Sequence, residues 1–316
     1  MSDTLARIAV LGSFMQACCW SMERLPRAGE TLRARSFATE AAGKGLSVAV
    51  GCHRLGAHVD LVMAVGNDAP AAGLLAWLRS EGLDTRFVRA HDMPSGHGAG
   101  FIDARGDNHV VVHPGANDAL GPGHIAAAHA PIRSAALLYA QLEVPIAAVR
   151  AALALARKHG VATVLNPSPW QPLPDDVLAA TDVLVVNAVE AQDLLGPALP
   201  ASRDECLRAV AAALPALWRR WAGDWLVVTL GDQGSAAWRR DGASHVAAAL
   251  PVRAVKTLGA GDAFSAGLCC ALAEGKDMAA ALAAGNACGA WSVAHPGILA
   301  ALPGRALLQT AFRTGA

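Results

Sequence analysis

Residues 257–267 of this 316-residue chain read Thr257-Leu258-Gly259-Ala260-Gly261-Asp262-Ala263-Phe264-Ser265-Ala266-Gly267. Apolar residues 252–255 precede the stretch and small apolar residues follow it, so the pattern predicts a strand end, a Gly-rich turn and a helix. The first turn of a helix has unpaired backbone N–H groups, and the helix dipole adds about half a positive charge there. We therefore expect an anion-binding site at residues 259–261.

Asp262 stands at the mouth of this expected site. A carboxylate that only made the surface soluble would compete with the anion. The place suits a general base, which would remove a proton from a hydroxyl as that hydroxyl attacks a phosphoryl group. The alternative is that Asp262 merely caps the helix, and the Gly-x-Gly-Asp pattern by itself leaves both interpretations open.

Composition narrows the class of protein. Hydrophobic residues make up 53% of the chain and charged residues 16%, which allows a large buried core. Lys plus Arg and Asp plus Glu are each 26, so the net charge is zero. Proteins that bind nucleic acid or anionic membranes carry an excess of basic residues. We therefore expect neither among its partners.

The seven cysteines indicate a reduced setting. They include the adjacent pairs Cys18-Cys19 and Cys269-Cys270 but no Cys-x-x-Cys, so neither a disulfide framework nor a zinc site is predicted. The first residues lack the apolar region of a signal peptide, and no unbroken apolar run of about 18 residues occurs. Without linker or repeat, we expect one domain over residues 1–316, located in the cytoplasm.

Strand-like and helix-like segments alternate regularly from residue 135 onward, which predicts a mostly parallel sheet covered by helices on both faces. An antiparallel hairpin is expected at 235–249, and a separate one near 98–112. The expected strands are 135–140, 161–165, 182–187, 225–230 and 252–257, and the last helices are 263–274, 277–294 and 304–313.

Polar or Gly residues follow four of these strands. They are Glu143, Asn187, the segment 229–231 and the segment 259–262. Ligands of such sheets bind at the carboxyl ends of the strands, so we expect these groups to converge at one edge. The alternative for each taken singly is an ordinary polar loop.

The ordered motifs of nearly the whole chain resemble those of the ribokinase family of sugar kinases, also called the PfkB family. Thr229-Leu230-Gly231-Asp232-Gln233-Gly234 resembles its nucleotide loop, and Gln141-Leu142-Glu143 resembles its acceptor motif. The other motifs are Gly12-Ser13, Pro26–Thr31, Ala42–Gly45 with Arg54–Ala57, Val65–Asp68, His113–Asn117, Leu165–Pro169, Asn187–Glu190 and Gly259–Asp262.

The resemblance implies a three-layer α/β/α domain with a small β-sheet lid built from residues about 13–40 and 92–113. It implies transfer of the γ-phosphate of ATP to a hydroxymethyl group of a sugar or sugar-like acceptor. Asp262 would be the base, and the backbone N–H groups of Gly259, Ala260 and Gly261 would stabilise the transferring phosphoryl group. Asn187 and Glu190 would hold Mg²⁺ through water molecules. A homodimer through the lid is also implied.

The same resemblance assigns the two binding pockets. Alternatives remain for three of the residues: Asn286 as a solvated helix position, Lys44 as a surface lysine, and Glu190 as an exposed helix residue. ATP would be bound by Asn187, Thr229, Gly231, Gly234, Gly261 and Asn286, and the acceptor by Gly43, Lys44, Ser47, Glu143, Met15 and Asp262.

The chain departs from the family at the acceptor site. Ribokinases carry Asn and Asp where this chain has Met15 and Ala17, and Asn where it has Ser47. A site that pairs with a hydroxyl discriminates strongly, so losing the polar partners changes the preferred acceptor. We expect an acceptor with fewer hydroxyls or a more apolar side than ribose, facing a wall of Met15, Phe14 and Trp20.

A second departure is Lys256, which stands where ribokinases have an Asp that helps to bind an activating monovalent cation. The ammonium group would replace that cation or abolish its site, so we expect activity without K⁺. Two other functions stay open at this point. They are a nucleoside kinase of the same fold and a sugar-binding regulator without catalysis.

Overall fold

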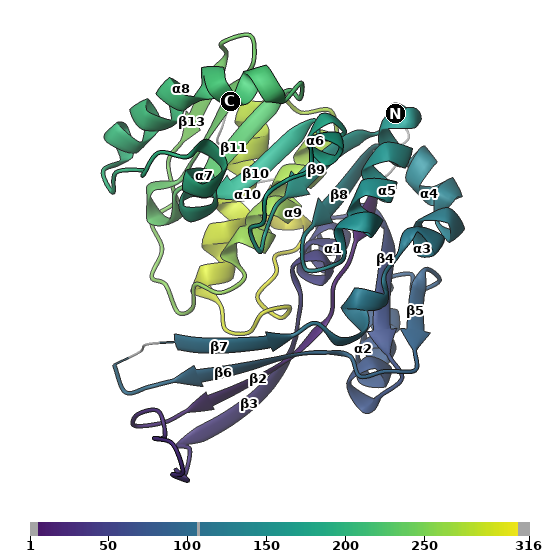
Figure 1. Cartoon of the computed structure of the whole chain (residues 1–316), viewed down its shortest axis with the longest axis vertical. Helices are drawn as coiled ribbons and strands as arrows, with labels where there is room; N and C mark the ends of the chain where they lie inside the picture. Colours follow the sequence, from purple (N-terminus) through teal and green to yellow (C-terminus); the bar gives the residue numbers. More distant parts are fainter. Residues whose placement is uncertain (1–5, 106–107, 309–316) are drawn as a thin grey trace.

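The computed structural model describes residues 6–105 and 108–308. Its centre is a nine-stranded sheet with the order β13-β12-β11-β10-β9-β8-β1-β4-β5 (Figure 1). Neighbouring strands from β11 to β5 in this spatial order are parallel. Strand β12 pairs antiparallel with both β11 and β13. The strands are β1 (Arg7–Leu11), β4 (His58–Gly66), β5 (Val88–His91), β8 (Leu137–Gln141), β9 (Ala162–Asn166), β10 (Val183–Asn187), β11 (Trp225–Thr229), β12 (Ser235–Arg239) and β13 (Ser244–Ala247).

Helices cover both faces of this sheet, and each face has its own apolar core. Ile8 and Val10 of β1 belong to one core, and Ala9 and Leu11 belong to the other, because successive strand residues point to opposite faces. The first core lies under α1 (Lys44–Arg54), α2 (Ala69–Ser80), α9 (Ala260–Ala273) and α10 (Met278–Ala294). The second lies under α3 (Pro122–Ala127), α4 (His129–Ser134), α5 (Ile146–Lys158), α6 (Asp175–Ala179), α7 (Ala188–Leu195) and α8 (Arg203–Arg220).

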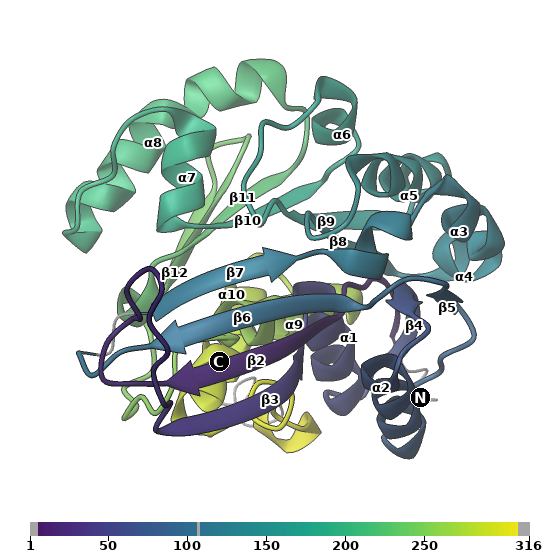
Figure 2. The ribbon, with the colours of Figure 1, turned by 60° about the horizontal axis from the view of Figure 1, so that its bottom comes forward.

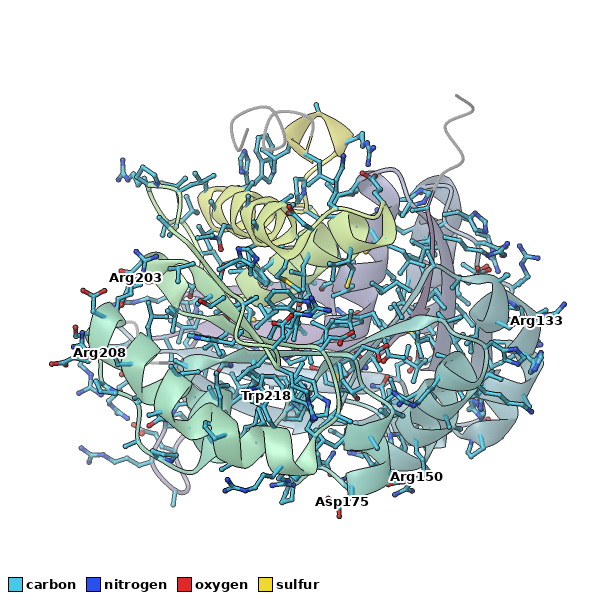
Figure 3. All side chains as sticks on the ribbon, turned by 90° about the horizontal axis from the view of Figure 1, so that it is seen from above. Arg133, Arg150, Asp175, Arg203, Arg208 and Trp218 are labelled. Atoms are coloured by element: carbon cyan, nitrogen blue, oxygen red, sulfur yellow. The ribbon has the colours of Figure 1, made fainter. Side chains whose placement is uncertain are left out.

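The helical layers separate apolar from charged side chains. Figure 3 shows the yellow helices above the sheet and the green α8 below it, with Arg133, Arg150 and Asp175 at the outer rim. All three of these side chains are exposed. Among the described residues, no helix combines the length and the apolar character that crossing a bilayer needs.

A separate four-stranded sheet extends from one edge of the body (Figure 2). Its order is β3-β2-β6-β7, so it joins the segment after β1 with a later hairpin. The predicted fold class, a three-layer sandwich with a small additional sheet, is therefore confirmed. The strands are β2 (Met15–Ser21), β3 (Ser36–Ala42), β6 (Gly96–Ile102) and β7 (Asn108–His113), and residues 106–107 of the predicted turn lie outside the described residues.

The prediction of a strand at 252–257 was wrong. These residues join no sheet, and the side chains of Val252 and Val255 are 45% and 63% exposed. The N–H groups of Val255 and Lys256 both donate to the carbonyl of Val293 in α10 instead of to a strand. Helix α9 also begins at Ala260, earlier than predicted. The predicted helix 304–313 lies partly outside the described residues. Within its described part, residues 305–308 are helical.

Candidate active site

Three distant segments meet at the carboxylate of Glu143, which follows β8. The hydroxyl of Ser13, which follows β1, donates to Glu143 Oε2 at 2.6 Å. The backbone N–H of Lys44, at the start of α1, donates to the same oxygen at 2.8 Å. The N–H of Gly45 donates to Ser13 Oγ at 3.3 Å. These bonds hold Glu143 at the carboxyl edge of the sheet, where the sequence places it.

Gly43 makes this close approach possible. Its φ is 130°, a region that residues with a side chain rarely adopt. A Cβ atom at this position would lie 2.1 Å from the carbonyl oxygen of Ser13. The residue before α1 must therefore be glycine for the Ser13 and Lys44 segments to reach one carboxylate.

Asp262 is half-buried in the first turn of α9. Burial raises the pKa of its carboxyl to about 7, and the ammonium of Lys44 acts in the opposite direction. The charges of Glu143 and Glu190 also raise the pKa, and the value of about 7 is the net result of burial and these charges. These interactions come from α1, the end of β8 and α7, so the predicted residues of four segments share one region.

Ser47 lies behind the same region. It is 1% exposed, and its hydroxyl has no hydrogen-bond partner among the described residues. A buried hydroxyl without a partner costs about 1–3 kcal/mol, so this group calls for an explanation. Ser47 also lowers the pKa of Asp262 through side-chain hydrogen bonding, so the Asp262 carboxylate is one group that can take this hydroxyl.

The turn before α9 presents backbone toward open space. Gly259 caps the helix with a φ of 90°, in the left-handed region. The N–H of Ala260 donates to the carbonyl of Thr257 at 3.3 Å. Gly261 is exposed, and no atom lies within 4 Å of the position that a Cβ would take. An anion can therefore approach the helix N-terminus from the side of Gly261.

Asn187 and Glu190 form a capping box at the start of α7. Asn187 Oδ1 accepts from the N–H groups of Val189 and Glu190 at 2.9 Å each, and Glu190 Oε2 accepts from the N–H of Asn187 at 3.0 Å. Glu190 is 7% exposed, so the alternative of an ordinary exposed residue was wrong. The second oxygen of Glu190 and the amide nitrogen of Asn187 take no part in this box.

Thr229 pairs with Asn187 across neighbouring parallel strands, which brings the nucleotide loop beside the capping box. The loop closes through a bond from the N–H of Leu230 to the carbonyl of Gly234 at 2.8 Å. Gly231 and Gly234 have φ values of 61° and 94°. Both glycines therefore serve the turn itself.

Asn286 is not a solvated helix position, because it is only 9% exposed. Its Oδ1 accepts from the hydroxyl of Ser235 at 3.0 Å. Its Nδ2 donates to the carbonyls of Ala247 and Ala248 at 3.2 and 3.0 Å. The amide thus ties α10 to the β12–β13 hairpin, and this structural role was not predicted.

The predicted apolar wall is only partly correct. Met15 and Ala17 share the face of the small sheet that looks toward the body, because Glu40, which pairs with Ala17, contacts body residues. Trp20 lies on the opposite face and stacks with Phe37 and Phe101, at centroid distances of 4.9 and 5.5 Å. Met15 and Trp20 are an odd number of residues apart in β2, and successive side chains of a strand point to opposite faces, so the two cannot share one wall.

Phe14 also does not belong to the wall, because it is 1% exposed and packs in the first core. Asn117 fixes its backbone: Oδ1 accepts from the N–H of Phe14, and Nδ2 donates to its carbonyl, both at 2.8 Å. Sequence reasoning gave no role to Asn117 or Ser13. Ser13 carried the same signal as Glu143, a polar residue directly after a buried strand.

This sheet topology, with a carboxylate in the first turn of a helix and polar groups from several strand ends, is that of an α/β kinase. The chain matches the model of the pfkB family carbohydrate kinases over residues 5–305. It therefore belongs to this family, and it is an ATP-dependent sugar kinase.

Relatives with known activity include a ribokinase of Bacillus subtilis, 33% identical over 95% of this chain and 97% of its own length. A deoxyribokinase of Salmonella typhi is 32% identical over 94% of this chain and 95% of its own. Among solved structures, Arabidopsis thaliana ribokinase in complex with ribose and ATP superimposes with a TM-score of 0.88, at 25% identity over 98% and 99% of the two chains. These relatives do not favour a nucleoside kinase or a silent regulator.

Proposed function

We propose that the chain transfers the γ-phosphate of ATP to the hydroxymethyl group of a pentose-like sugar. Asp262 removes the proton of the hydroxyl, the oxygen forms a bond to the γ-phosphorus, and the bond from that phosphorus to the β,γ-bridging oxygen breaks to release ADP. The carrying observation is the place of Asp262 in the first turn of α9, next to the helix N-terminus, where burial raises the pKa of its carboxyl to about 7. A base with this pKa is ready to accept a proton near neutral pH.

The negative charge of the transferring phosphoryl group is stabilised from two sides. The helix N-terminus at Gly259 and Gly261 supplies backbone N–H groups and the positive end of the α9 dipole, and the N–H of Ala260 would join them by leaving the Thr257 carbonyl. Asn187 and Glu190 would hold Mg²⁺ through water. Mg²⁺ usually keeps several of its waters and is bound by one or two carboxylates together with substrate phosphates.

The nucleotide is proposed to lie along the ends of β10 and β11. Asn187 and Thr229 mark these adjacent ends. Gly231 and Gly234, both with positive φ, allow the tight turn of the loop that follows. Asn286 supports this pocket by holding the hairpin behind it. The open side of Gly261 then faces the γ-phosphate.

The acceptor is proposed to lie between the polar edge of the large sheet and the small sheet, which acts as a lid. Lys44, Ser47 and Glu143 offer polar groups from below, with Gly43 giving room. Met15 and Ala17 offer only apolar surface from above. The protein therefore offers hydrogen-bond partners to hydroxyls on only one side of the sugar, which favours a deoxypentose over ribose.

Rates with ATP on D-ribose, 2-deoxy-D-ribose and nucleosides test the acceptor. We expect faster phosphorylation of the deoxy sugar at low concentration, and a clear preference for D-ribose would refute the acceptor proposal. Asp262→Asn tests the chemistry. Turnover should fall by about 10²–10⁴-fold while ATP affinity is kept, because only the proton transfer is removed. Unchanged turnover would exclude Asp262 as the base.

We also propose a homodimer through the outer face of the small sheet, in the cytoplasm. Trp20, Phe37 and Phe101 gather on that face, and Phe37 is 57% exposed. The seven cysteines are free thiols, as a reducing compartment favours. Sedimentation of the chain and of a Phe37→Ser variant tests the dimer, which the variant should weaken.

A further inference from the structure

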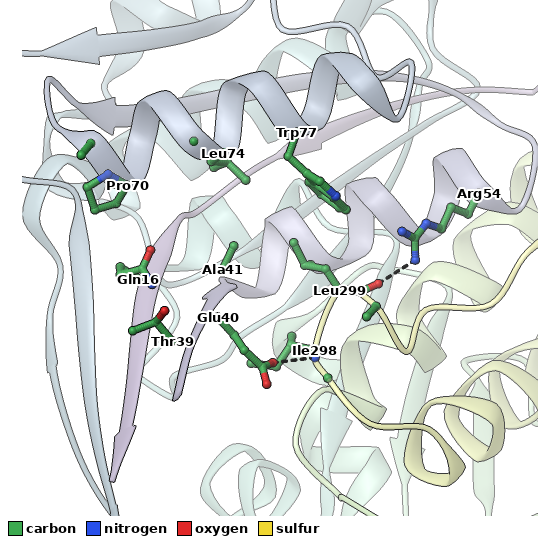
Figure 4. A pocket seen from close by; sticks show the side chains of 14 residues that line it. Gln16, Thr39, Glu40, Ala41, Arg54, Pro70, Leu74, Trp77, Ile298 and Leu299 are labelled. Carbon is green, nitrogen blue, oxygen red and sulfur yellow. Dashed lines mark hydrogen bonds between the residues drawn. The ribbon is translucent and has the colours of Figure 1, made fainter. Parts of the chain in front are cut away.

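The side chain of Glu40 extends from the small sheet and contacts two loops of the body. It lies in β3, three residues before Gly43. Its Oε2 accepts from the backbone N–H of Ile298 at 2.8 Å (Figure 4). The ammonium of Lys256 lies 3.5 Å from the same oxygen. One carboxylate of the small sheet thus holds the loop before α9 and the loop after α10.

Both contacted loops lie next to Gly259, the cap of α9. Lys256 precedes Gly259 by three residues, and the N–H of Lys256 is fixed on the Val293 carbonyl. The side chain of Ile298 lies 3.8 Å from the position that a Cβ of Gly259 would take. Any shift of Glu40 therefore acts on the N-terminus of α9 by two routes, one through the chain and one through packing.

The same end of β3, which is followed by Gly43 and Lys44, leads to the acceptor side. Lys44, four residues after Glu40, donates its N–H to Glu143. Strand β3 is consequently the shortest covalent path between the groups proposed to bind the sugar and the carboxylate that touches the anion-binding loop.

The ion pair between Glu40 and Lys256 can change its geometry at little cost in free energy. The side chains of Lys256 and Glu40 are 25% and 39% exposed, and ion pairs at such positions contribute about 1 kcal/mol or less. Glu40 also lines a cavity of about 620 Å³ between β3, α2 and residues 297–300. Figure 4 shows Thr39, Leu74 and Trp77 around this cavity, which leaves β3 room to move against the body.

We propose that Glu40 is a positioning residue that couples the small sheet over the acceptor to the anion-binding N-terminus of α9. Sugar that binds beneath the small sheet fixes the position of β3. Glu40 then fixes the positions of Lys256 and Ile298, and the phosphate site at the N-terminus of α9 closes in response. The inference rests on the proposed function. It requires that sugar and nucleotide strengthen each other's binding by the same factor, as linkage demands.

Calorimetric titration with the β,γ-imido analogue of ATP tests this coupling. The analogue is titrated with and without saturating 2-deoxy-D-ribose or D-ribose, whichever sugar is phosphorylated. In the unaltered protein we expect sugar to tighten the analogue by about fivefold or more. In Glu40→Ala the gain should fall below about twofold, while the affinity of each ligand alone changes little.

Two further variants separate the two arms of the contact. Glu40→Gln keeps an oxygen for the Ile298 N–H but loses the charge, and Lys256→Met loses the ammonium. Both should reduce the coupling partly and to the same extent. If Glu40→Ala does not fold, these two milder variants decide the matter. Glu30→Gln is the control, because Glu30 pairs with Arg24 within the β2–β3 connection, and its coupling should be unchanged.

Coupling that is undiminished in Glu40→Ala, or undiminished in both milder variants, would overturn the proposal. So would an unaltered protein that phosphorylates the sugar but shows no coupling at all. An unaltered protein that neither binds nor phosphorylates either sugar would instead refute the proposed function, so the two failures are distinguishable.

Discussion

The hydroxyl of Ser13 and the carboxylate of Glu143, 130 positions apart in the chain, form a hydrogen bond of 2.6 Å. Ser13 is fully buried, and it also receives the N–H of Gly45. The bond therefore fixes the orientation of Glu143 at the meeting point of β1, β8 and α1. Its removal should affect the acceptor more than the nucleotide.

Ser13→Ala should raise the KM for the sugar about tenfold or more, because a hydrogen bond to a charged group contributes about 1.5–3 kcal/mol. The KM for ATP should stay nearly constant. Steady-state kinetics with each substrate varied in turn measure both. Ser134→Ala is the control, since that hydroxyl bonds only to the Pro131 carbonyl in α4. An unchanged sugar KM in Ser13→Ala would show that Glu143 does not orient the acceptor.

The pH dependence of kcat should follow Asp262. The carboxylate must be ionised to accept a proton, and burial raises its pKa to about 7. We therefore expect kcat to rise with pH through about 7 as one proton is lost. A flat profile between about pH 5 and 8 would argue against this base.

The same pKa shift predicts a stability difference. The folded protein holds the Asp262 proton more tightly than the unfolded chain, whose reference pKa is 3.8. The stability from this proton is present in full below about pH 3.8 and is lost as pH rises through about 7. Urea unfolding should therefore show Asp262→Asn gaining stability relative to the unaltered protein between about pH 5 and 8. An equal difference at both pH values would contradict the shift.

Glu190→Gln separates capping from metal binding. The amide oxygen can still accept the Asn187 N–H, so the melting temperature should change little. The lost charge should raise the Mg²⁺ concentration for half-maximal rate by about tenfold, the order of a lost metal-supporting group. Glu205→Gln, an exposed change in the first turn of α8, is the control. An unchanged Mg²⁺ requirement would leave Glu190 with the capping role alone.

Activity should not depend on K⁺. The ammonium of Lys256 already supplies a positive charge beside Glu40, at 3.5 Å from its carboxylate. Initial rates in KCl and in tetramethylammonium chloride of equal ionic strength should agree within about twofold, as screening by the two salts is the same. A large stimulation by K⁺ would refute this expectation.

Gly43→Ala should lower the free energy of unfolding by on the order of 3 kcal/mol, because the new methyl would clash with the Ser13 carbonyl and φ is positive. Gly73→Ala is the matched control in α2. No atom lies within 4 Å of its Cβ position, so alanine there should add about 0.5–1 kcal/mol. Urea denaturation measures both, and equal stabilities would show that the approach of Gly43 to Ser13 is not required.

The sequence by itself determined the layered sheet and the groups at its edge. Apolar periodicity reports local burial, so β8 through β11 and their helices were predictable, as were Glu143 and Asn187 at strand ends. The same periodicity misled at 252–257. Val252 and Val255 are exposed, and the N–H groups of Val255 and Lys256 bond to Val293 of α10 instead of to a strand.

Only the tertiary structure decided which distant groups face each other. It placed Trp20 away from Met15, gave the amide of Asn286 to the hairpin, and brought Glu40 to Lys256 and Ile298. A sequence pattern records how each residue is buried within its own element. It does not record the packing of elements against one another, and the pairing of side chains across the site depends on that packing.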